Sequence, residues 1–224
     1  RTMMQRRVRV GAVHALANAI PTTQVAFDTG WPAADVAHLL DGSLYLDRDA
    51  GTADDAELTS RVESLVKHSA ATGALGIVVT GSFFGEAAKQ ARGGVDVPVL
   101  TSFDGIIERA LALGRPLHVL STTTDSAALM SEELEQEATR RSQRLSVSNH
   151  PVSGALDALL GGDPEQHDRL IVEEVRAVDP DTAILFAQFS MERILPDSAA
   201  VRSAPVIGPA SEAVAYLRKL ITQE

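Results

Sequence analysis

The sequence predicts an α/β protein made of two pseudo-symmetric lobes, each a parallel four-stranded sheet flanked by helices, with the active site between the lobes. Short β-branched runs alternate with stretches rich in alanine, leucine and glutamate, which is typical of βα units. The second half of the chain also repeats the first in order. Of the 224 residues, 45% are hydrophobic and 22% are charged, so the chain can bury a substantial core.

The first half contains four predicted strands: Val8–Val13, Val36–Leu40, Leu75–Val79 and Val97–Leu100. The helices expected between them lie around Gln24–Phe27, over Asp54–Thr72, from the Gly81–Phe84 turn through Ala91, and over Phe103–Leu113. Apolar residues recur at helical spacing in the second of these helices, and two aspartates stand near its start, where a helix favours negative charge.

The second half contains predicted strands at Leu117–Ser121, Leu145–Val147, Ala183–Ala187 and Val206–Ile207. Its expected helices are Ser126–Arg144, Pro164–Val178 and Ser211–Ile221. Gly114 and Pro116 punctuate the chain between the halves. The predicted lobes are therefore residues 1–114 with 208–224, and residues 115–207.

Three strands match between the halves at one constant offset. Val10–Val13 falls on Leu117–Leu120, and the segment that contains Pro98 falls on the one that contains Pro205. The run Ile77–Thr80 likewise falls on Ile184–Ala187. An internal duplication explains the matches better than chance likeness between apolar strands. Ligands of open α/β sheets bind beyond the carboxyl ends of the strands, so the turns after these strands are expected to line one cleft.

Composition excludes several classes of function. The chain has no cysteine, which removes disulfides, thiolate metal sites and cysteine nucleophiles. Its formal charge of −10 and the lack of a basic run argue against nucleic acid as a partner. No apolar run could span a membrane, and Arg1–Arg7 is interpreted as a terminal tail without the apolar region of a signal peptide. A cytoplasmic protein is expected.

Short motifs along nearly the whole chain resemble the aspartate/glutamate/hydantoin racemase superfamily, which includes arylmalonate decarboxylase and maleate isomerase. The motifs are Val13-His14-Ala15-Leu16, Trp31-Pro32, Leu39-Leu40-Asp41 with Ser43-Leu44 and Asp47, Thr80-Gly81-Ser82-Phe83-Phe84-Gly85, Pro98-Val99-Leu100, His167-Asp168 and Ala187-Gln188-Phe189-Ser190-Met191. The likeness is greatest to a poorly characterised Asp/Glu racemase-like branch. The resemblance implies two α/β lobes, no metal or organic cofactor, and a possible homodimer.

The resemblance also implies where the chemistry would lie. Racemases of this superfamily use two cysteines, one at a strand end in each lobe, to remove and return the α-proton of a carboxylate on opposite faces. The corresponding positions here are Gly81 and Gln188. Two-thiol racemisation is therefore excluded for this chain.

Without the two thiols, the sequence still contains a turn that is suited to binding an anion. Thr80–Phe84 combines a glycine, a hydroxyl and backbone N–H groups at a strand-to-helix junction, which suits a carboxylate or an enolate-like oxyanion. Ser82 is the strongest contact candidate, although it could simply cap the following helix. Thr122, Thr123 and Thr124 form the matching polar turn, or else a solvated loop.

Each candidate for acid–base catalysis could instead have a structural role. His14 ends the first strand and titrates near neutrality, but a purely structural histidine fits equally well. His167 beside Asp168 favours a structural role. The predicted catalytic residues are His14, Ser82 and Gln188. The predicted substrate-binding residues are Gly81, Phe83, Thr122, Thr123, Phe189, Ser190, Asp41 and His167.

Three hypotheses on function follow. The first is a cofactor-independent enzyme that acts at the α-carbon of a small carboxylate, as an isomerase or a decarboxylase. The second is an inactive or repurposed relative that binds a small anion. The third is a cysteine-to-glycine variant at Gly81 of a one-cysteine enzyme. The Walker, dinucleotide-binding, metal-binding and nucleophile-elbow motifs are all missing from the sequence.

Overall fold

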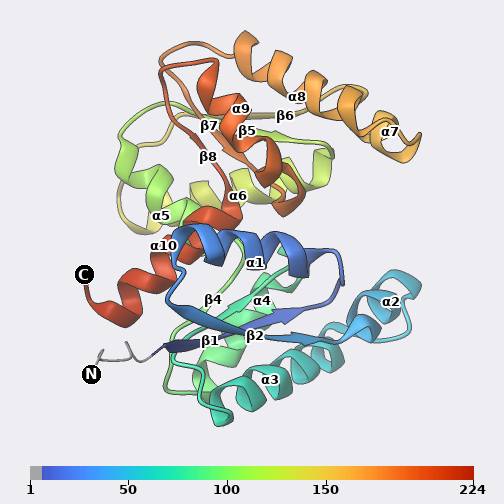
Figure 1. Ribbon diagram of the computed structural model, residues 1–224, viewed down its shortest axis with the longest axis vertical. Coiled ribbons are helices and arrows are strands. Elements are labelled where there is room, and N and C mark those ends of the chain that lie inside the picture. The colour runs from blue at the N-terminus through green and yellow to red at the C-terminus, as the bar shows by residue number, and fades with distance from the viewer. Residues whose placement is uncertain (1–6) are drawn as a thin grey trace, which may run out of the picture. The chain divides into compact units, whose positions relative to one another are not determined.

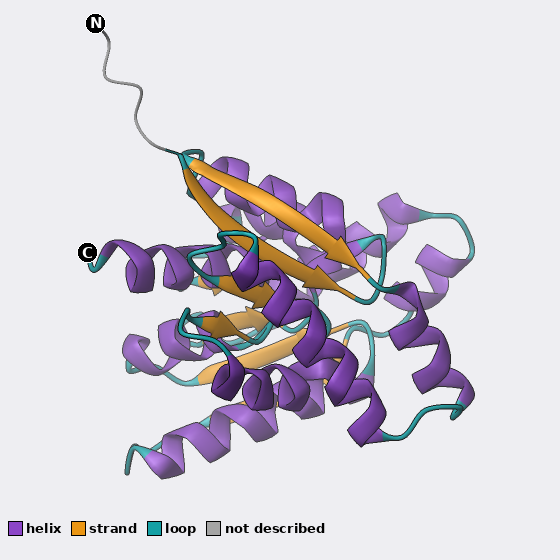
Figure 2. Cartoon of the chain, turned by 90° about the horizontal axis from the view of Figure 1, so that it is seen from below, coloured by secondary structure: helices purple, strands orange, loops and turns teal. Residues whose placement is uncertain are grey.

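The computed structural model describes residues 7–224; the rest of the predicted terminal tail lies outside the described residues. The chain forms two compact units, unit 1 with Arg1–Gly105 and Ala213–Glu224, and unit 2 with Ile106–Glu212. Each unit contains one parallel four-stranded sheet with helices on its faces (Figures 1 and 2). The predicted fold class is confirmed.

The elements of unit 1 follow one another as β1 (Val8–His14), α1 (Ala19–Gly30), β2 (Ala34–Leu40), α2 (Gly42–Ala50), α3 (Asp55–Ala71), β3 (Ile77–Val79), the 3-10 helix η1 (Ser82–Phe84), α4 (Gly85–Ala91), η2 (Arg92–Gly94) and β4 (Val99–Leu100). Two helices contain the points where the chain passes between the units: α5 (Asp104–Leu113) and α10 (Pro209–Thr222).

Unit 2 continues with β5 (Leu117–Ser121), α6 (Thr124–Arg140), β6 (Val147–Pro151), α7 (Ala155–Leu160), α8 (Pro164–Ala177), β7 (Ala183–Phe186), η3 (Phe189–Ile194), α9 (Leu195–Ala200) and β8 (Val206–Ile207). Pro164 stands in the first turn of α8, where its missing N–H leaves no helical hydrogen bond unmade.

The two sheets have the same topology and the same register. Their strand orders are β2-β1-β3-β4 and β6-β5-β7-β8. Gly11 pairs with Ile77 in unit 1, and His118 pairs with Ile184 at the matching place in unit 2. Ile77 then pairs with Val99, as Ile184 pairs with Val206. The repeat read from the sequence is thus a repeat of the sheet itself.

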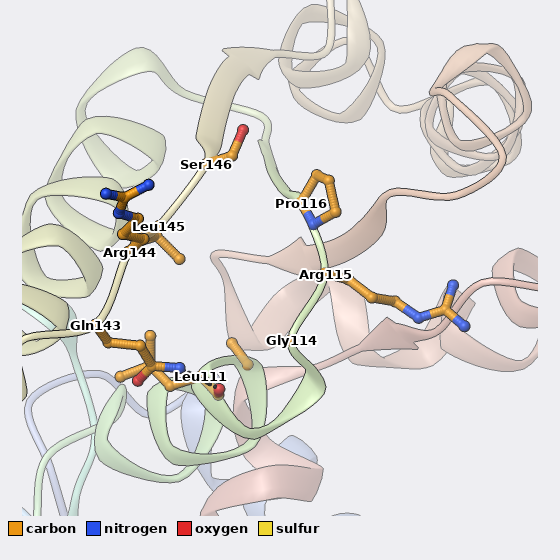
Figure 3. Close-up of a pocket in the computed structure, with 9 residues that line it drawn as sticks. Leu111, Gly114, Arg115, Pro116, Gln143, Arg144, Leu145 and Ser146 are labelled. Atoms are coloured by element: carbon orange, nitrogen blue, oxygen red, sulfur yellow. Dashed lines mark hydrogen bonds between the residues drawn. The ribbon is translucent and has the colours of Figure 1, made fainter.

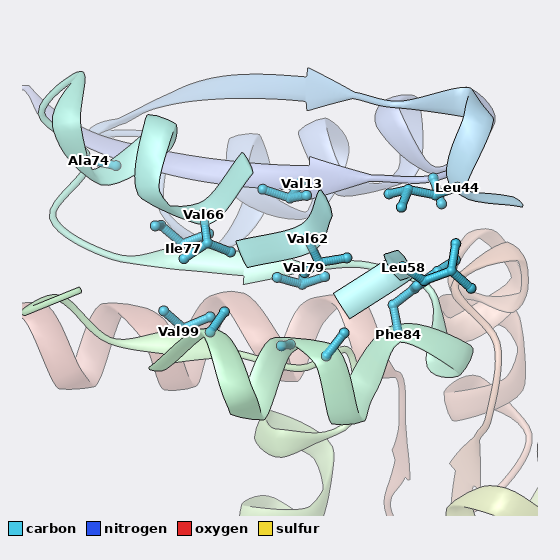
Figure 4. Packing of buried hydrophobic residues seen from close by; sticks show 14 residues of the cluster. Val13, Leu44, Leu58, Val62, Val66, Ala74, Ile77, Val79, Phe84 and Val99 are labelled. Carbon is cyan, nitrogen blue, oxygen red and sulfur yellow. The ribbon is translucent and has the colours of Figure 1, made fainter. Parts of the chain in front are cut away.

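Successive side chains of β1 point to opposite faces of the sheet, and different helices cover the two faces. Val13 packs with Val62 and Val66 of α3 in a buried cluster that also contains Phe84 (Figure 4). The other face carries His14, which is bonded through His38 to Gln24 of α1. Helices α1 and α3 therefore cover opposite faces of the sheet of unit 1 (Figure 1).

Several elements differ from the predictions, and helices α7 and α9 form in segments for which no element was predicted. Helix α6 ends at Arg140, before the predicted Arg144, because the chain reverses at Ser142, which has a φ of 53°. The strand predicted at Leu145–Val147 begins at Val147 and continues to Pro151. Helix α2 forms in a segment for which no helix was predicted, with Asp41 as its N-cap. Ion pairs form on α6 between Glu137 and both Arg140 and Arg141.

Candidate active site

The carboxyl ends of three strands gather the candidate residues of unit 1. His14 ends β1, Asp41 follows β2, and Gly81 comes shortly after β3. The N–H group of Asp41 donates to the carbonyl oxygen of His14 at 3.0 Å, and that of Thr80 donates to Val13 at 2.9 Å. Parallel strands end at the same edge of a sheet, so these turns lie side by side.

Gly81 gives the turn after β3 its shape. Its φ of 89° and ψ of 111° lie in a region that residues with a Cβ rarely adopt. The chain then enters η1, whose first hydrogen bond runs from Phe84 N–H to the Gly81 carbonyl. The Ser82 and Phe83 N–H groups precede this bond, and within residues 7–224 neither has a protein acceptor. Two adjacent donors are therefore available to an anion.

Sequence reasoning missed Arg48, a partly exposed residue of α2. Its guanidinium carbon lies 3.7 Å from the centroid of the Phe83 ring, and that ring is 47% exposed. The guanidinium has no carboxylate partner among the described residues, because nearby Asp47 pairs with Arg61 at 2.6 Å. A stacked guanidinium keeps its N–H edge free for a carboxylate. Arg48 was missed because the polar segment that contains it was not predicted to form a helix.

Asp41 has a structural task that the sequence did not predict. Its carboxylate accepts hydrogen bonds from the backbone N–H of Ser43 at 2.9 Å and from the Ser43 hydroxyl at 2.5 Å. It thereby caps the helix that carries Arg48. Its predicted contact with substrate stays a prediction.

His14 is fully buried, and hydrogen bonds occupy both of its ring nitrogens. Nδ1 lies 2.6 Å from the Thr80 hydroxyl, and Nε2 lies 2.9 Å from Nδ1 of His38. Burial, together with the nearby His38 ring, lowers the pKa of His14 from 6.5 to about 4. In this arrangement His14 contacts the turn only through Thr80. This is the contact expected of a structural histidine, which was the alternative to a catalytic role.

In unit 2, Gln188 joins two strand ends. Its Oε1 accepts from both the backbone N–H and the hydroxyl of Thr122, each at 2.8 Å. The amide NH₂ group is thereby directed away from Thr122, so it can donate to another group. Thr123 accepts from the N–H of Ser126 and caps α6, as a purely structural residue would. Phe189 is partly exposed and Ser190 exposed, both in η3 just after Gln188.

His167 lies in the first turns of α8 and is buried. Its Nδ1 lies 2.7 Å from a carboxylate oxygen of Asp168, which also accepts from Arg193 of η3 at 2.7 Å. These contacts hold α8 against the segment that follows β7. The Nε2 atom of His167 is buried, and no partner for it lies among the described residues.

A hollow of about 370 Å³ lies at the other edge of sheet 2 (Figure 3). It is lined by Pro116 and Ser146, which come just before β5 and β6. Its two arginines, Arg115 and Arg144, point in different directions and do not converge on one point (Figure 3). The hollow is therefore separate from the strand ends that carry the candidate residues.

Among residues 7–224, no three histidine or acidic side chains are grouped so that they could hold a metal ion. None of the helices in the same range is both long enough and apolar enough to cross a bilayer.

The fold and these strand ends define an α/β protein of two repeated units with hydrogen-bond donors at the carboxyl edges of its sheets. A family model described as Asp/Glu/Hydantoin racemase matches residues 27–217, and the chain belongs to this family. The comparison with curated proteins finds no match.

Solved structures share the fold at low sequence identity. Allantoin racemase from Klebsiella pneumoniae has a TM-score of 0.69 at 16% identity, over 96% of this chain and 88% of that one. Picrophilus torridus aspartate racemase has a TM-score of 0.69 at 13% identity, over 96% and 94%. Unliganded arylmalonate decarboxylase has a TM-score of 0.64 at 13% identity, over 96% and 93%.

Proposed function

We propose that this protein is a cofactor-independent enzyme that acts at the α-carbon of a small carboxylate. Membership of the Asp/Glu/Hydantoin racemase family supports the proposal, because related folds include aspartate racemase and arylmalonate decarboxylase. The observation that carries it is the turn at Gly81–Phe83, which presents two free N–H groups and an aromatic ring on which the guanidinium of Arg48 stacks. Such donors stabilise an anion and the enolate that forms from it.

The reaction must proceed without thiols. In a decarboxylation, the bond between the α-carbon and one carboxylate breaks, its electron pair forms an enolate, and CO₂ leaves. A proton from solvent water then adds to the α-carbon. The turn would hold the remaining carboxylate as its negative charge spreads. The hydroxyl and the N–H group of Ser82, for which no partner lies among the described residues, are the proposed contacts to it.

A proton transfer that inverts the α-carbon is the other form of the proposal. It needs a base and an acid on opposite faces of the carbanion. Neither Gly81 nor the Gln188 amide can be that base. His14 could serve only through the Thr80 hydroxyl, since both of its nitrogens are occupied. The geometry therefore supports decarboxylation better than inversion.

In unit 2, we propose that the free amide of Gln188 and the neighbouring Ser190 are donors that can bind a carboxylate. An amide at a strand end can bind a carboxylate but cannot remove a proton near neutral pH. The same proposal includes contacts to the ligand from Thr122, Phe189 and His167. It also includes a homodimer and a cytoplasmic location.

The second candidate is a relative that binds a small anion without turning it over. Occupied nitrogens on His14 and a capping role for Asp41 favour it, because they leave few groups free for acid–base work. The third hypothesis, a cysteine-to-glycine variant, is disfavoured by the backbone at Gly81. A cysteine would have to adopt a φ of 89°, with its Cβ 3.3 Å from the Phe84 ring.

One experiment separates these functions. The protein is incubated in D₂O with phenylmalonate, methylmalonate, aspartate and glutamate, and NMR follows CO₂ loss and deuterium at the α-carbon. The proposal expects turnover of a malonate that falls at least tenfold in Ser82→Ala. Ser203→Ala, at an exposed serine of unit 2, is the matched control. A ligand that raises the melting temperature but is never turned over would establish the binding protein instead.

A further inference from the structure

Five side chains of unit 1 form a hydrogen-bonded row that leads from a strand end to the surface. The Thr80 hydroxyl lies 2.6 Å from Nδ1 of His14, and Nε2 of His14 lies 2.9 Å from Nδ1 of His38. Nε2 of His38 lies 2.9 Å from Oε1 of Gln24, whose Nε2 donates to Asp28 at 2.8 Å. We call this row the Thr80–Asp28 chain.

The last member fixes the direction of every bond in the Thr80–Asp28 chain. An ionised carboxylate only accepts, so Gln24 must present its NH₂ group to Asp28 and its oxygen to His38. His38 must then carry its proton on Nε2. In a neutral ring this leaves Nδ1 of His38 as an acceptor, so His14 also carries its proton on Nε2.

This direction decides where the Thr80 hydroxyl points. Nδ1 of His14 is then an acceptor, and the hydroxyl must donate to it. An alternative acceptor is close by, because the Thr80 oxygen lies 3.3 Å from the carbonyl of Val13. If the tautomer of His14 were reversed, Nδ1–H would donate to Thr80 and the hydroxyl would turn to Val13. Two arrangements therefore exist, and Gln24 selects between them.

Unit 2 contains an independent row with the same order of groups. The Ser148 hydroxyl lies 2.5 Å from Nδ1 of His118, and Nε2 of His118 lies 2.9 Å from Nδ1 of His150. Nε2 of His150 lies 2.7 Å from the carboxylate of Glu174. The same logic places both protons on Nε2 here. The row is not inherited from the duplication, since His118 matches Gly11 and not His14.

We propose that Gln24 and His38 are positioning residues, which hold His14 as its Nε2–H tautomer and thereby direct the Thr80 hydroxyl at His14. Thr80 immediately precedes Gly81, so this bond fixes the strand end that carries the anion-binding turn. The effect on ligand binding rests on the proposed function, whereas the effect on the tautomer does not.

The test reads the tautomer directly. Two-bond ¹H–¹⁵N correlation spectra of ¹⁵N-labelled protein show which nitrogen of His14 is protonated, and spectra of His14→Gln and His38→Gln assign the ring signals. Wild type should show an unprotonated Nδ1. Gln24→Glu keeps an acceptor opposite His38 and should retain this pattern. Gln24→Leu removes the acceptor and should give a mixture of tautomers.

The matched control for the change to leucine is Gln136→Leu, at an exposed helical glutamine of α6. It should leave the His14 signals unchanged. A protonated Nδ1 in the wild type, or the same single tautomer in Gln24→Leu, would overturn the inference. Circular dichroism confirms that each variant is folded.

A second readout concerns the turn. Malonate binding, measured by calorimetry, should weaken about fivefold in Gln24→Leu and remain unchanged in Gln24→Glu, as expected for the loss of one net hydrogen bond. If malonate fails to bind the wild type, the proposed function is in doubt while the tautomer result stands. If malonate binds all variants equally, the tautomer does not affect the turn, and the positioning role is wrong.

Discussion

A Cβ atom added to Gly11 would lie 1.9 Å from the hydroxyl oxygen of Ser69, so helix α3 approaches strand β1 as closely as a glycine permits. At the matching place in unit 2 the chain carries His118, whose ring is buried and bonded to two neighbours on β6. The two halves thus have sheets of the same topology, but the packing above the matching position of each sheet differs. This divergence concerns packing, and it can be tested.

Gly11→Ala should destabilise the protein by about 1 to 3 kcal/mol, because the added methyl group overpacks a buried interface. The Cβ would also lie 3.3 Å from Ile77, so moving Ser69 alone does not make room for it. Urea unfolding measures the loss. Gly93→Ala is the control, since nothing lies within 4 Å of its added Cβ. Equal midpoints for the two variants would contradict the close approach.

Acid should weaken unit 1 through His14. Its folded pKa of about 4 lies below the ordinary 6.5, so between these values the unfolded chain binds more protons. The contribution of the neutral ring is complete above pH 6.5 and is lost as the pH falls toward 4. The loss at pH 4 should be on the order of 3 kcal/mol.

Urea midpoints at pH 7, 6, 5 and 4 test this dependence. Carboxylates also titrate in this range, so the informative quantity is the difference between wild type and His14→Gln. That difference should shrink steadily as the pH falls. A constant difference would show that His14 does not titrate as its burial implies.

The sheets could be predicted from the sequence because their signal is local and repeated. Runs such as Val206–Ile207 are apolar on both faces, and the match between Pro98 and Pro205 aligned the halves. Helix α2 could not be predicted, because its apolar residues are few and a cap at Asp41 together with Gly51 at its end defines it. Strand β6 was misplaced because its half-exposed residues lack an apolar pattern.

The site was predictable only as far as strand ends reveal it. The turn at Gly81 follows from a glycine after a buried strand, and the structure adds its positive φ. The stacking of Arg48 on Phe83 joins residues from separate elements, and no spacing along the chain encodes it. The partners of His14 are likewise 24 and 66 positions away.

Arg202 is expected to be a main support of unit 2. Its guanidinium donates to the carbonyl oxygens of Val175 at 2.9 Å, and of Asp179 and Thr182 at 2.6 Å each. The guanidinium thus provides hydrogen-bond donors for carbonyl oxygens at the end of α8 and in the loop that follows it. Arg202→Met keeps the apolar stem but leaves these carbonyls without a donor, and should destabilise the protein by about 3 kcal/mol.

Thermal unfolding compares this variant with Arg144→Met, a control at an exposed arginine that makes none of the hydrogen bonds described here. The control should unfold close to the wild-type temperature. Similar melting temperatures for the two variants would mean that water replaces the guanidinium at no loss, contrary to this account.

Placing a thiol at the strand end of unit 1 tests the proposed turn. Gly81→Cys should allow exchange of the α-proton of L-aspartate or L-glutamate with D₂O, because one thiolate can remove a proton and return it to the same face. The L-enantiomer should be retained, because inversion requires one group on each face of the carbanion. NMR measures the exchange, and chiral chromatography measures the enantiomers.

The strain at position 81 sets the condition for this experiment. A residue with a Cβ at a φ of 89° costs about 1 to 3 kcal/mol, so Gly81→Cys should melt below the wild type and must be assayed well below that temperature. Gly81→Ala is the control for the strain, since it carries the same Cβ without a thiol and should not exchange the α-proton. If folded Gly81→Cys exchanges no more α-proton than Gly81→Ala does, the turn does not hold the substrate, and Gly81 leaves the proposed site.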